Sequence, residues 1–143
     1  IYAAGDVAEY NGKTLGLWPV AVAQAEVAAA NAVAEAGKTE ATYDEIVPVT
    51  MLKVVGVDLT SIGRFLPEED EREIIDDNIE DQRYRKLVVT EEGGKTVAVG
   101  AILIGYPQLA QAVAEIIKSG INISSIVRQV ESGNWDGLAD MVE

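Results

Sequence analysis

A glycine and an aspartate stand together at positions 5 and 6, directly after the apolar run Ile1–Ala4. Such a run predicts a short buried strand, and ligands of open α/β sheets bind beyond the carboxyl ends of strands. Gly5 has no Cβ and would let the backbone approach a ligand closely, while Asp6 could accept hydrogen bonds from ligand hydroxyl groups. An aspartate here can equally cap the next turn of the chain. The residue types alone favour the turn-capping role.

Behind a turn-rich loop, the alanine-rich segment Trp18–Ala36 predicts a long helix. Pro19 suits the first turn of a helix, alanines are strong helix formers, and Gly37 is a natural stop. Glu26 is the only charged side chain in most of this segment, so we expect the helix to be buried on most sides. By sequence alone, the simplest interpretation is a core helix with Trp18 as an aromatic plug at its mouth.

Side chains for independent catalysis are scarce. The chain has no histidine and no cysteine, which removes the usual zinc ligands, the base of a Ser-His-Asp triad and all thiol chemistry. Carboxylates are abundant over Pro67–Gln82, but their spacing lacks the pattern of a calcium loop, and we expect a solvated surface. We therefore predict no catalytic and no metal-binding residue in this chain.

The charge of the chain limits its partners. A formal net charge of −13 repels phosphate backbones and anionic lipid, so we expect neither a nucleic acid nor a membrane as a partner. No apolar run reaches the roughly 20 residues that a membrane span needs. The G-x-G-x-x-G turn that binds a dinucleotide pyrophosphate is also missing from the sequence. A cytoplasmic setting is the expectation.

From a boundary placed near Thr42, the pattern becomes that of an α+β domain. Dense β-branched residues predict a strand within Val47–Val57, and Ile62–Pro67 is interpreted as a connection. Part of the acidic run is expected to form an edge strand guarded by charge. The apolar residues of that part are Ile74, Ile75 and Ile79.

The clearest strands are Arg83–Thr90 and Lys95–Ile104, which a Glu-Glu-Gly-Gly turn joins into a hairpin. Gly100 and Gly105 interrupt the second strand pattern and predict a bulge or a crossing. An amphipathic helix is predicted over Gln108–Lys118.

Three features complete the expected carboxyl-terminal end. Gly120 would stop the amphipathic helix, and Ser124 or Ser125 would cap a second helix that runs through Val130. A short final helix over Trp135–Val142 would be packed back by its tryptophan.

Two stretches of the sequence resemble a known family. IYAAGDVAEY, with LWPVAVAQAEVAAANAVAEAG behind it, is similar to the last flavin-contacting segment of the FAD-dependent pyridine nucleotide-disulfide oxidoreductases. RYRKLVVTEEGGKTVAVGAILIG resembles a hairpin of their carboxyl-terminal domain. The closest branch holds rubredoxin reductases, NADH oxidases and nitrite reductase flavoproteins. Residues 1–41 would then be the last strand, loop and helix of an FAD-binding α/β domain, and residues 42–143 the carboxyl-terminal α+β domain, a mixed or antiparallel sheet with carboxyl-terminal helices.

The resemblance also implies a cofactor site. Asp6 would bind the ribityl chain of FAD, and the amino end of the helix would point at the flavin ring, where its positive dipole end favours arriving electron density. The residues implied as FAD contacts are Gly5, Asp6, Val7, Trp18, Pro19 and Val20. The family's pyrophosphate and NAD(P)H turns lie upstream, so we expect this piece to be inactive alone and not to retain FAD.

The implied parent is a flavin-dependent NAD(P)H oxidoreductase. Its partners would be the rest of the flavoprotein, NAD(P)H and an electron acceptor, and a homodimer is compatible with the resemblance. Because the chain lacks histidine, the His-Glu pair of the glutathione and lipoamide reductase branch is excluded.

An alternative function needs no cofactor. The domain after Thr42 could be a non-catalytic interaction or oligomerisation module, with the first segment as an appended arm. The apolar strand and helix before Gly37 would then seek a partner surface, because they cannot bury themselves alone.

Overall fold

The structure, a computed structural model, describes residues 1–34, 40–54, 56–78 and 80–142. Its internal contacts divide the chain into two compact units, Ile1–Pro48 and Val49–Glu143. We call them the amino-terminal unit and the sheet unit. Residues 42–48 lie with the amino-terminal unit, where the ring of Tyr43 packs edge-on against Tyr10 with ring centroids 4.9 Å apart.

The amino-terminal unit is built on one helix, α1 (Trp18–Val33), and a single 3-10 turn, η1 (Gly5–Val7). The predicted helix start is confirmed, but the helix ends at Val33, short of the expected Ala36, because Ala34 already has an extended backbone. The expected stop at Gly37 lies outside the described residues. The strand expected over Ile1–Ala4 is wrong for this chain, because these residues form no strand pairing. A strand needs a hydrogen-bonded neighbour, and the described part of this unit offers none.

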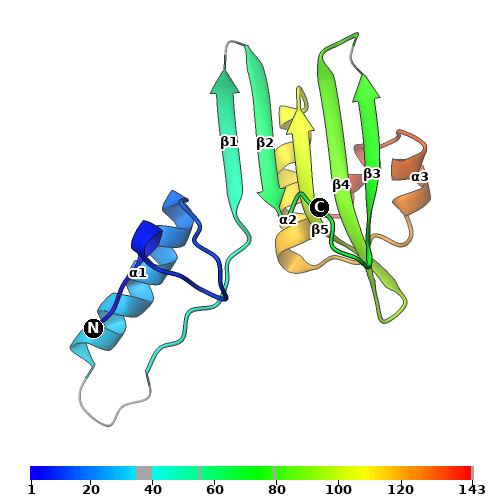
Figure 1. The fold of residues 1–143 in the computed structure, drawn as a ribbon. Helices are drawn as coiled ribbons and strands as arrows, with labels where there is room; N and C mark the ends of the chain where they lie inside the picture. The colour runs from blue at the N-terminus through cyan, green and yellow to red at the C-terminus, as the bar shows by residue number, and fades with distance from the viewer. Residues whose placement is uncertain (35–39, 55, 79, 143) are drawn as a thin grey trace. The chain divides into compact units, whose positions relative to one another are not determined.

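The sheet unit contains one antiparallel sheet of five strands in the order β1-β2-β5-β4-β3 (Figure 1). The strands are β1 (Val49–Val54), β2 (Val57–Gly63), β3 (Glu71–Asn78), β4 (Arg83–Glu92) and β5 (Lys95–Ile104). The predicted α+β class and the predicted β4–β5 hairpin are both confirmed. In the hairpin turn, Gly93 and Gly94 have φ values of +57° and +78°, which glycine adopts without strain.

Strand β2 corrects the sequence interpretation. The β-branched run was expected to be a single strand followed by a connection from Ile62 onward, but the chain reverses at Gly56 (φ +83°) and returns as β2. Ile62 lies inside β2, is fully buried and pairs with Ala101 of β5. The turn was hidden because the β-branched residues on its two sides look like one continuous run.

The guarded edge strand is confirmed as β3, which pairs only with β4 and carries charges along its length. Ile74 is buried, Ile75 is half exposed, and Ile79 lies outside the described residues. The interruption predicted in β5 is also confirmed, since the register against β4 shifts between Val88 and Val89. A Cβ at Gly100 would lie 1.8 Å from the carbonyl oxygen of Arg64, so this position admits only glycine.

The helices follow the sheet. The turn η2 (Pro107–Leu109) leads into α2 (Ala110–Ser119), which ends at Gly120 in the left-handed conformation as predicted. The short helix α3 (Val127–Glu131) begins after Ile126 without a side-chain cap, so the expected serine cap is wrong. Ser124 instead accepts a hydrogen bond from the backbone N–H of Thr96 (2.9 Å). The final helix shortens to a 3-10 turn, η3 (Asp136–Leu138).

The core of the sheet unit lies between the sheet and α2. Ile62, Ala101, Leu87 and Ile74 form one cross-strand row and are all buried. The buried residues of α2 and η2 that accompany them include Leu109, Val113, Ile116 and Ile117. Along the described residues, no helix combines the length and the hydropathy that crossing a lipid bilayer requires.

An arginine ties the sheet to the carboxyl-terminal segment. The guanidinium of Arg85 lies 4.5 Å from the ring centroid of Tyr106 and 4.9 Å from that of Trp135. It also forms an ion pair with Asp76 (2.6 Å) and donates to the carbonyl oxygen of Gly133 (2.8 Å). Trp135 is 1% exposed, as expected for the residue that packs this end of the chain.

Candidate cofactor-binding corner

Gly5 is held against the first turns of α1. Its N–H donates a hydrogen bond to Oε1 of Gln24 (2.8 Å), and its φ of +74° lies in the region that favours glycine. A Cβ at this position would approach the Cβ of Ala21 to 3.2 Å. The structure therefore brings the Gly-Asp pair to the helix, and this close approach depends on glycine.

Asp6 stands on the exposed side of the same turn. The loop that returns toward α1 passes close to it, since a Cβ built on Gly16 would lie 3.9 Å from Oδ1 of Asp6. Asp6 is the middle residue of η1, whose own N-cap position is Ala4, so the role of Asp6 as a cap of the following turn stays a prediction. Val7 follows with 82% of its surface exposed.

The other three predicted FAD contacts, Trp18, Pro19 and Val20, lie at the start of α1 and face different ways. Leu17 precedes the helix without a side-chain cap, and its carbonyl oxygen accepts the first helical bond from Ala21 (3.0 Å). Trp18 is 82% exposed and Pro19 is also exposed, whereas Val20 is 1% exposed. The side chain of Val20 thus points into the unit, and Trp18 and Pro19 face outward.

The expectation that α1 is buried on most sides is wrong for this chain. Val20 is its only buried residue, although the helix is nearly free of charge. An uncharged helix is buried where another layer covers it. The described part of the amino-terminal unit contains no second helix or sheet to provide that layer.

Two polar side chains of α1 stabilise the unit, and the sequence interpretation missed both. Gln24 binds Gly5, and the amide of Asn31 forms two hydrogen bonds with the backbone of Ala41 (2.7 and 2.8 Å). These residues are seven positions apart, so they lie on one face of the helix. That spacing in an alanine-rich helix was the signal that could have identified them.

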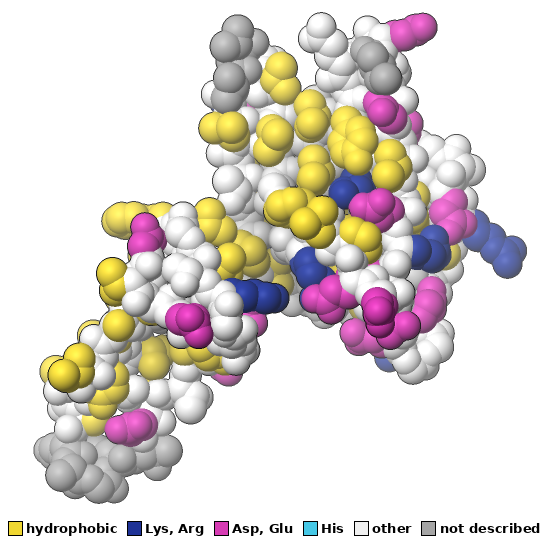
Figure 2. Space-filling model, viewed as in Figure 1, with side chains coloured by type: hydrophobic (Ala, Val, Ile, Leu, Met, Phe, Trp, Pro, Cys, Tyr) yellow, Lys and Arg dark blue, Asp and Glu magenta, His cyan; other side chains and the backbone are white. Residues whose placement is uncertain are grey.

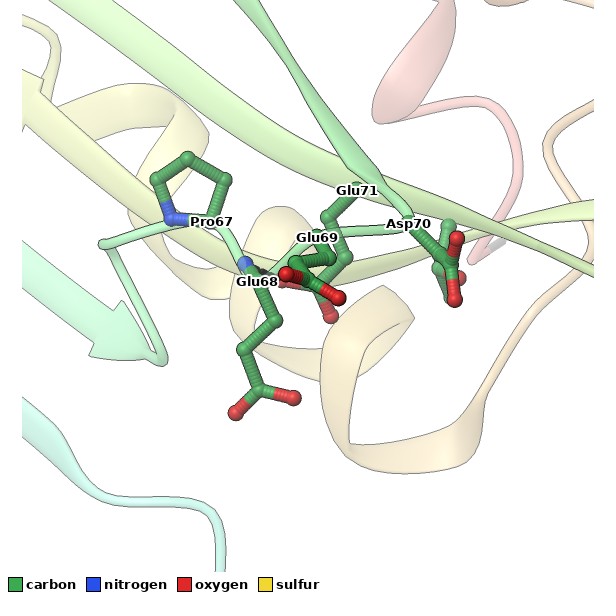
Figure 3. A pocket seen from close by; sticks show the side chains of 6 residues that line it. Pro67, Glu68, Glu69, Asp70 and Glu71 are labelled. Carbon is green, nitrogen blue, oxygen red and sulfur yellow. Dashed lines mark hydrogen bonds between the residues drawn. The ribbon is translucent and has the colours of Figure 1, made fainter.

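An acidic concavity in the sheet unit is the second candidate site (Figure 3). It encloses about 700 Å³ and is lined by Pro67, Glu68, Glu69, Asp70, Glu71 and Thr90. The carboxylates of Glu68, Glu69 and Asp70 point to different sides (Figure 3). No three carboxylates in the described ranges are placed to share a metal ion.

Glu71 is tied down within this concavity. Its carboxylate accepts a hydrogen bond from the backbone N–H of Glu68 (2.8 Å) and pairs with the guanidinium of Arg64. Burial on its own would raise the pKa of Glu71, but the bonds from Glu68 and Arg64 outweigh it and hold the pKa below its ordinary value. These contacts anchor the loop between β2 and β3 and serve the fold.

Comparison with known proteins identifies the family to which the chain belongs. Residues 48–121 match the family described as the rubredoxin NAD+ reductase C-terminal domain. The chain belongs to this family. The match begins beside the boundary between the two units and covers the whole sheet. The resemblance drawn from the sequence is thereby confirmed.

The relatives are much longer than this chain. It is 36% identical over 127 residues to the NADH-rubredoxin oxidoreductase of Clostridium acetobutylicum, covering 88% of this chain and 31% of that protein. It is 32% identical over 124 residues to the nitrite reductase (NAD(P)H) of Bacillus subtilis, covering 87% of this chain and 14% of that protein. The chain thus spans about a third or less of the curated relatives it matches.

A solved structure is similar in fold. The crystal structure of NADH:rubredoxin oxidoreductase from Clostridium acetobutylicum superposes with a TM-score of 0.62 at 30% identity, over 92% of this chain and 33% of that one. Such coverage extends beyond the sheet unit, so the likeness includes much of the amino-terminal unit. The chain therefore corresponds to the carboxyl-terminal part of a reductase of this family.

Proposed function

We propose that this chain is the carboxyl-terminal part of a flavin-dependent NAD(P)H oxidoreductase. In that parent, the amino-terminal unit forms one wall of the FAD site and the sheet unit is an interface domain. The observation that carries the proposal is the similarity to NADH-rubredoxin oxidoreductase, which reaches across both units. The two curated relatives are named for different acceptors, rubredoxin and nitrite, so the proposal names the flavin and the nicotinamide and no acceptor.

The corner formed by η1 and the start of α1 fits part of FAD. The turn at Gly5 packs tightly on α1, since a Cβ there would lie 3.2 Å from the Cβ of Ala21, and this packing fixes the turn that carries Asp6. Beside it, Asp6 presents an exposed carboxylate that can accept hydrogen bonds from the ribityl hydroxyl groups. The uncapped amino end of α1 offers unpaired N–H groups and a positive dipole end.

Each residue of this corner has a defined role in the proposal. Asp6 positions the ribityl chain, the exposed indole of Trp18 covers an edge of the flavin ring and excludes water, and Pro19 holds the first turn in place. Val20 supports this turn from inside the unit. The chemistry that FAD supplies when bound is hydride acceptance from NAD(P)H and electron transfer to an acceptor. A cytoplasmic setting and a homodimer stay predictions for the parent.

The test uses the longer protein that carries this sequence. Asp6→Ala should weaken FAD binding by about 10- to 100-fold, because a charge-assisted hydrogen bond to the ribityl chain is lost. Titration of the apoprotein with FAD, followed by flavin absorbance, measures the change. Glu9→Ala removes another exposed carboxylate of the same loop and should leave the affinity unchanged. Equal affinities for Asp6→Ala and the unsubstituted protein would reject the role of Asp6.

The alternative, a non-catalytic interaction module, draws on the exposed apolar side chains of the amino-terminal unit. The large ones are Ile1, Tyr2, Val7, Trp18, Val22 and Val33. Sedimentation of the 143-residue chain at several concentrations tests whether they drive self-association. A dimer that persists in a longer, flavin-free protein would favour this module over the reductase.

A further inference from the structure

The strand register assigns the side chains of the sheet to two faces. In one row, Leu52 is opposite Leu59, Leu59 is opposite Ile104, and Ile104 is opposite Tyr84. The next row on the same face is mixed and contains Thr50, Ser61, Ile102, Lys86 and Ile75. The core row through Ile62 and Leu87 lies on the other face, against α2. We call the face of the first two rows the open face.

The open face is apolar without being covered. Leu52 and Ile75 are each 51% exposed, and Leu59, Tyr84, Ile102 and Ile104 are partly exposed. Figure 2 shows hydrophobic side chains gathered over the sheet on this face, the side away from α2 in Figure 1. An antiparallel sheet with one solvated face normally alternates apolar and polar residues. A contiguous apolar patch in its place indicates a surface that another body covers.

The loop between β2 and β3 covers only one end of the open face. It crosses the sheet at Gly100, where the carbonyl of Arg64 takes the space of a side chain, and it leaves Val88 fully buried. Phe65 and Leu66 in the same loop stay 42% and 65% exposed. The loop therefore does not close the open face.

An ion pair sits within the open face in a form that tolerates burial. Nζ of Lys86 lies 2.7 Å from Oε1 of Glu73, and the Lys86 side chain is already 9% exposed. Covering one unpaired charge is costly, whereas a pair that already satisfies itself can be covered at much lower cost. Another surface can thus cover this face without burying an unpaired charge at Lys86 or Glu73.

We propose that the open face is the surface by which the sheet unit packs against the upstream flavin- and nicotinamide-binding part of its own parent chain. This inference rests on the proposed function. The aligned part makes up 31% of the NADH-rubredoxin oxidoreductase and 14% of the nitrite reductase, so in such a parent a large body is available to cover the face. A second copy is disfavoured, because each chain carries a net charge of −13 and Asp77 stands opposite Tyr84 on this face.

Thiol labelling can test this contact, because the chain has no native cysteine. Leu52→Cys places a thiol on the open face, and Met51→Cys places one next to it on the same strand, facing the other way. Both native side chains are exposed, 51% and 66%, so both variants of the 143-residue chain should react with iodoacetamide at rates within about twofold. In the longer protein, the thiol of Leu52→Cys should react at least about tenfold more slowly, while that of Met51→Cys should not. Mass spectrometry of the labelled peptide separates these thiols from others.

Three outcomes would overturn the proposal. The first is equal labelling of Leu52→Cys in the short and long proteins. The second is protection in the short chain that grows with its concentration, which would assign the face to a second copy. The third is protection in the short chain at every dilution, which would assign the face to the amino-terminal unit. Flavin absorbance of the same longer protein tests the proposed function separately, since protection without bound FAD would reject the flavin site and keep the contact.

Discussion

The amino-terminal unit and the sheet unit bury their apolar residues to very different degrees. Among the described residues, every buried hydrophobic side chain except Val20 lies in the sheet unit. The sheet unit encloses a core between five strands and α2, whereas α1 leaves most of its alanine-rich surface exposed. A helix of 16 residues whose single charge is Glu26 gains little from folding unless another layer covers it.

The two units therefore differ in whether their own residues are enough to determine their fold. The sheet unit buries enough area to determine its own fold. The amino-terminal unit has a defined local structure, but its apolar side chains stay mostly exposed. This is the pattern expected if the sheet unit is a domain and the amino-terminal unit is part of a larger one. The match of the family to residues 48–121 agrees with that division.

The largest effect should come from the core of the sheet unit. Leu87→Ala removes a fully buried side chain of β4 and should lower the free energy of unfolding by about 2–5 kcal/mol. The chain has two tryptophans, and Trp135 is buried in this unit, so its fluorescence during urea unfolding, in a Trp18→Phe background, measures the change.

Val20→Ala is the matched control for this comparison. Val20 is also buried, but in the amino-terminal unit, so the urea midpoint reported by Trp135 should stay the same. If Val20→Ala shifted that midpoint as far as Leu87→Ala, the two units would share one cooperative transition and the contrast between them would fail.

The sequence predicted most of the sheet unit because its signals are local. The apolar and β-branched runs of β4 and β5, the Gly-Gly turn and the apolar face from Leu109 to Ile117 depend on neighbours within a few residues. The division between β1 and β2 was missed although they form a local hairpin with Val54 opposite Val57, because β-branched residues continue on both sides of the turn. A β-branched run carries no mark of where it folds back, apart from Gly56.

The candidate site was predictable in its residues and not in its arrangement. The Gly-Asp pair and the start of α1 were identified from residue types and resemblance, and the structure brings Gly5 to α1. The contact itself runs through Gln24, nineteen positions away, and nothing in the local sequence selects that residue. The expected strand at Ile1–Ala4 failed for the same reason, since strand formation depends on residues that are distant in the sequence.

A smaller effect is expected in the amino-terminal unit. Gln24→Ala removes the acceptor for the Gly5 N–H and should destabilise the turn by about 1 kcal/mol. Amide exchange at Gly5, followed by NMR, should accelerate several-fold. Gln24→Glu keeps an acceptor oxygen and should restore protection. If the alanine variant left exchange at Gly5 unchanged, the turn would be held by something other than this bond, and the picture of a unit stabilised by single polar contacts would need revision.

The smallest effect concerns the pH dependence of the sheet unit. The pKa of Glu71 is below its ordinary value of 4.5 in the folded state, so its stabilisation is fully present above pH 4.5 and is lost as the pH falls through the folded-state pKa. Glu71→Gln should therefore cost about 0.5–1 kcal/mol at pH 7, and this cost should vanish in acid. The difference between the urea midpoints of the two proteins at each pH isolates Glu71 from the other acidic residues.

Glu69→Gln, an exposed neighbour in the same concavity, is the control and should show no difference at either pH. The urea midpoints of Glu71→Gln and the unsubstituted protein could instead differ as much or more in acid. Glutamine would then replace even the protonated carboxyl poorly, and the Glu71 contact would depend on shape and not on charge. In that case, the sheet unit would be held together at this loop by packing alone, as it is in its core.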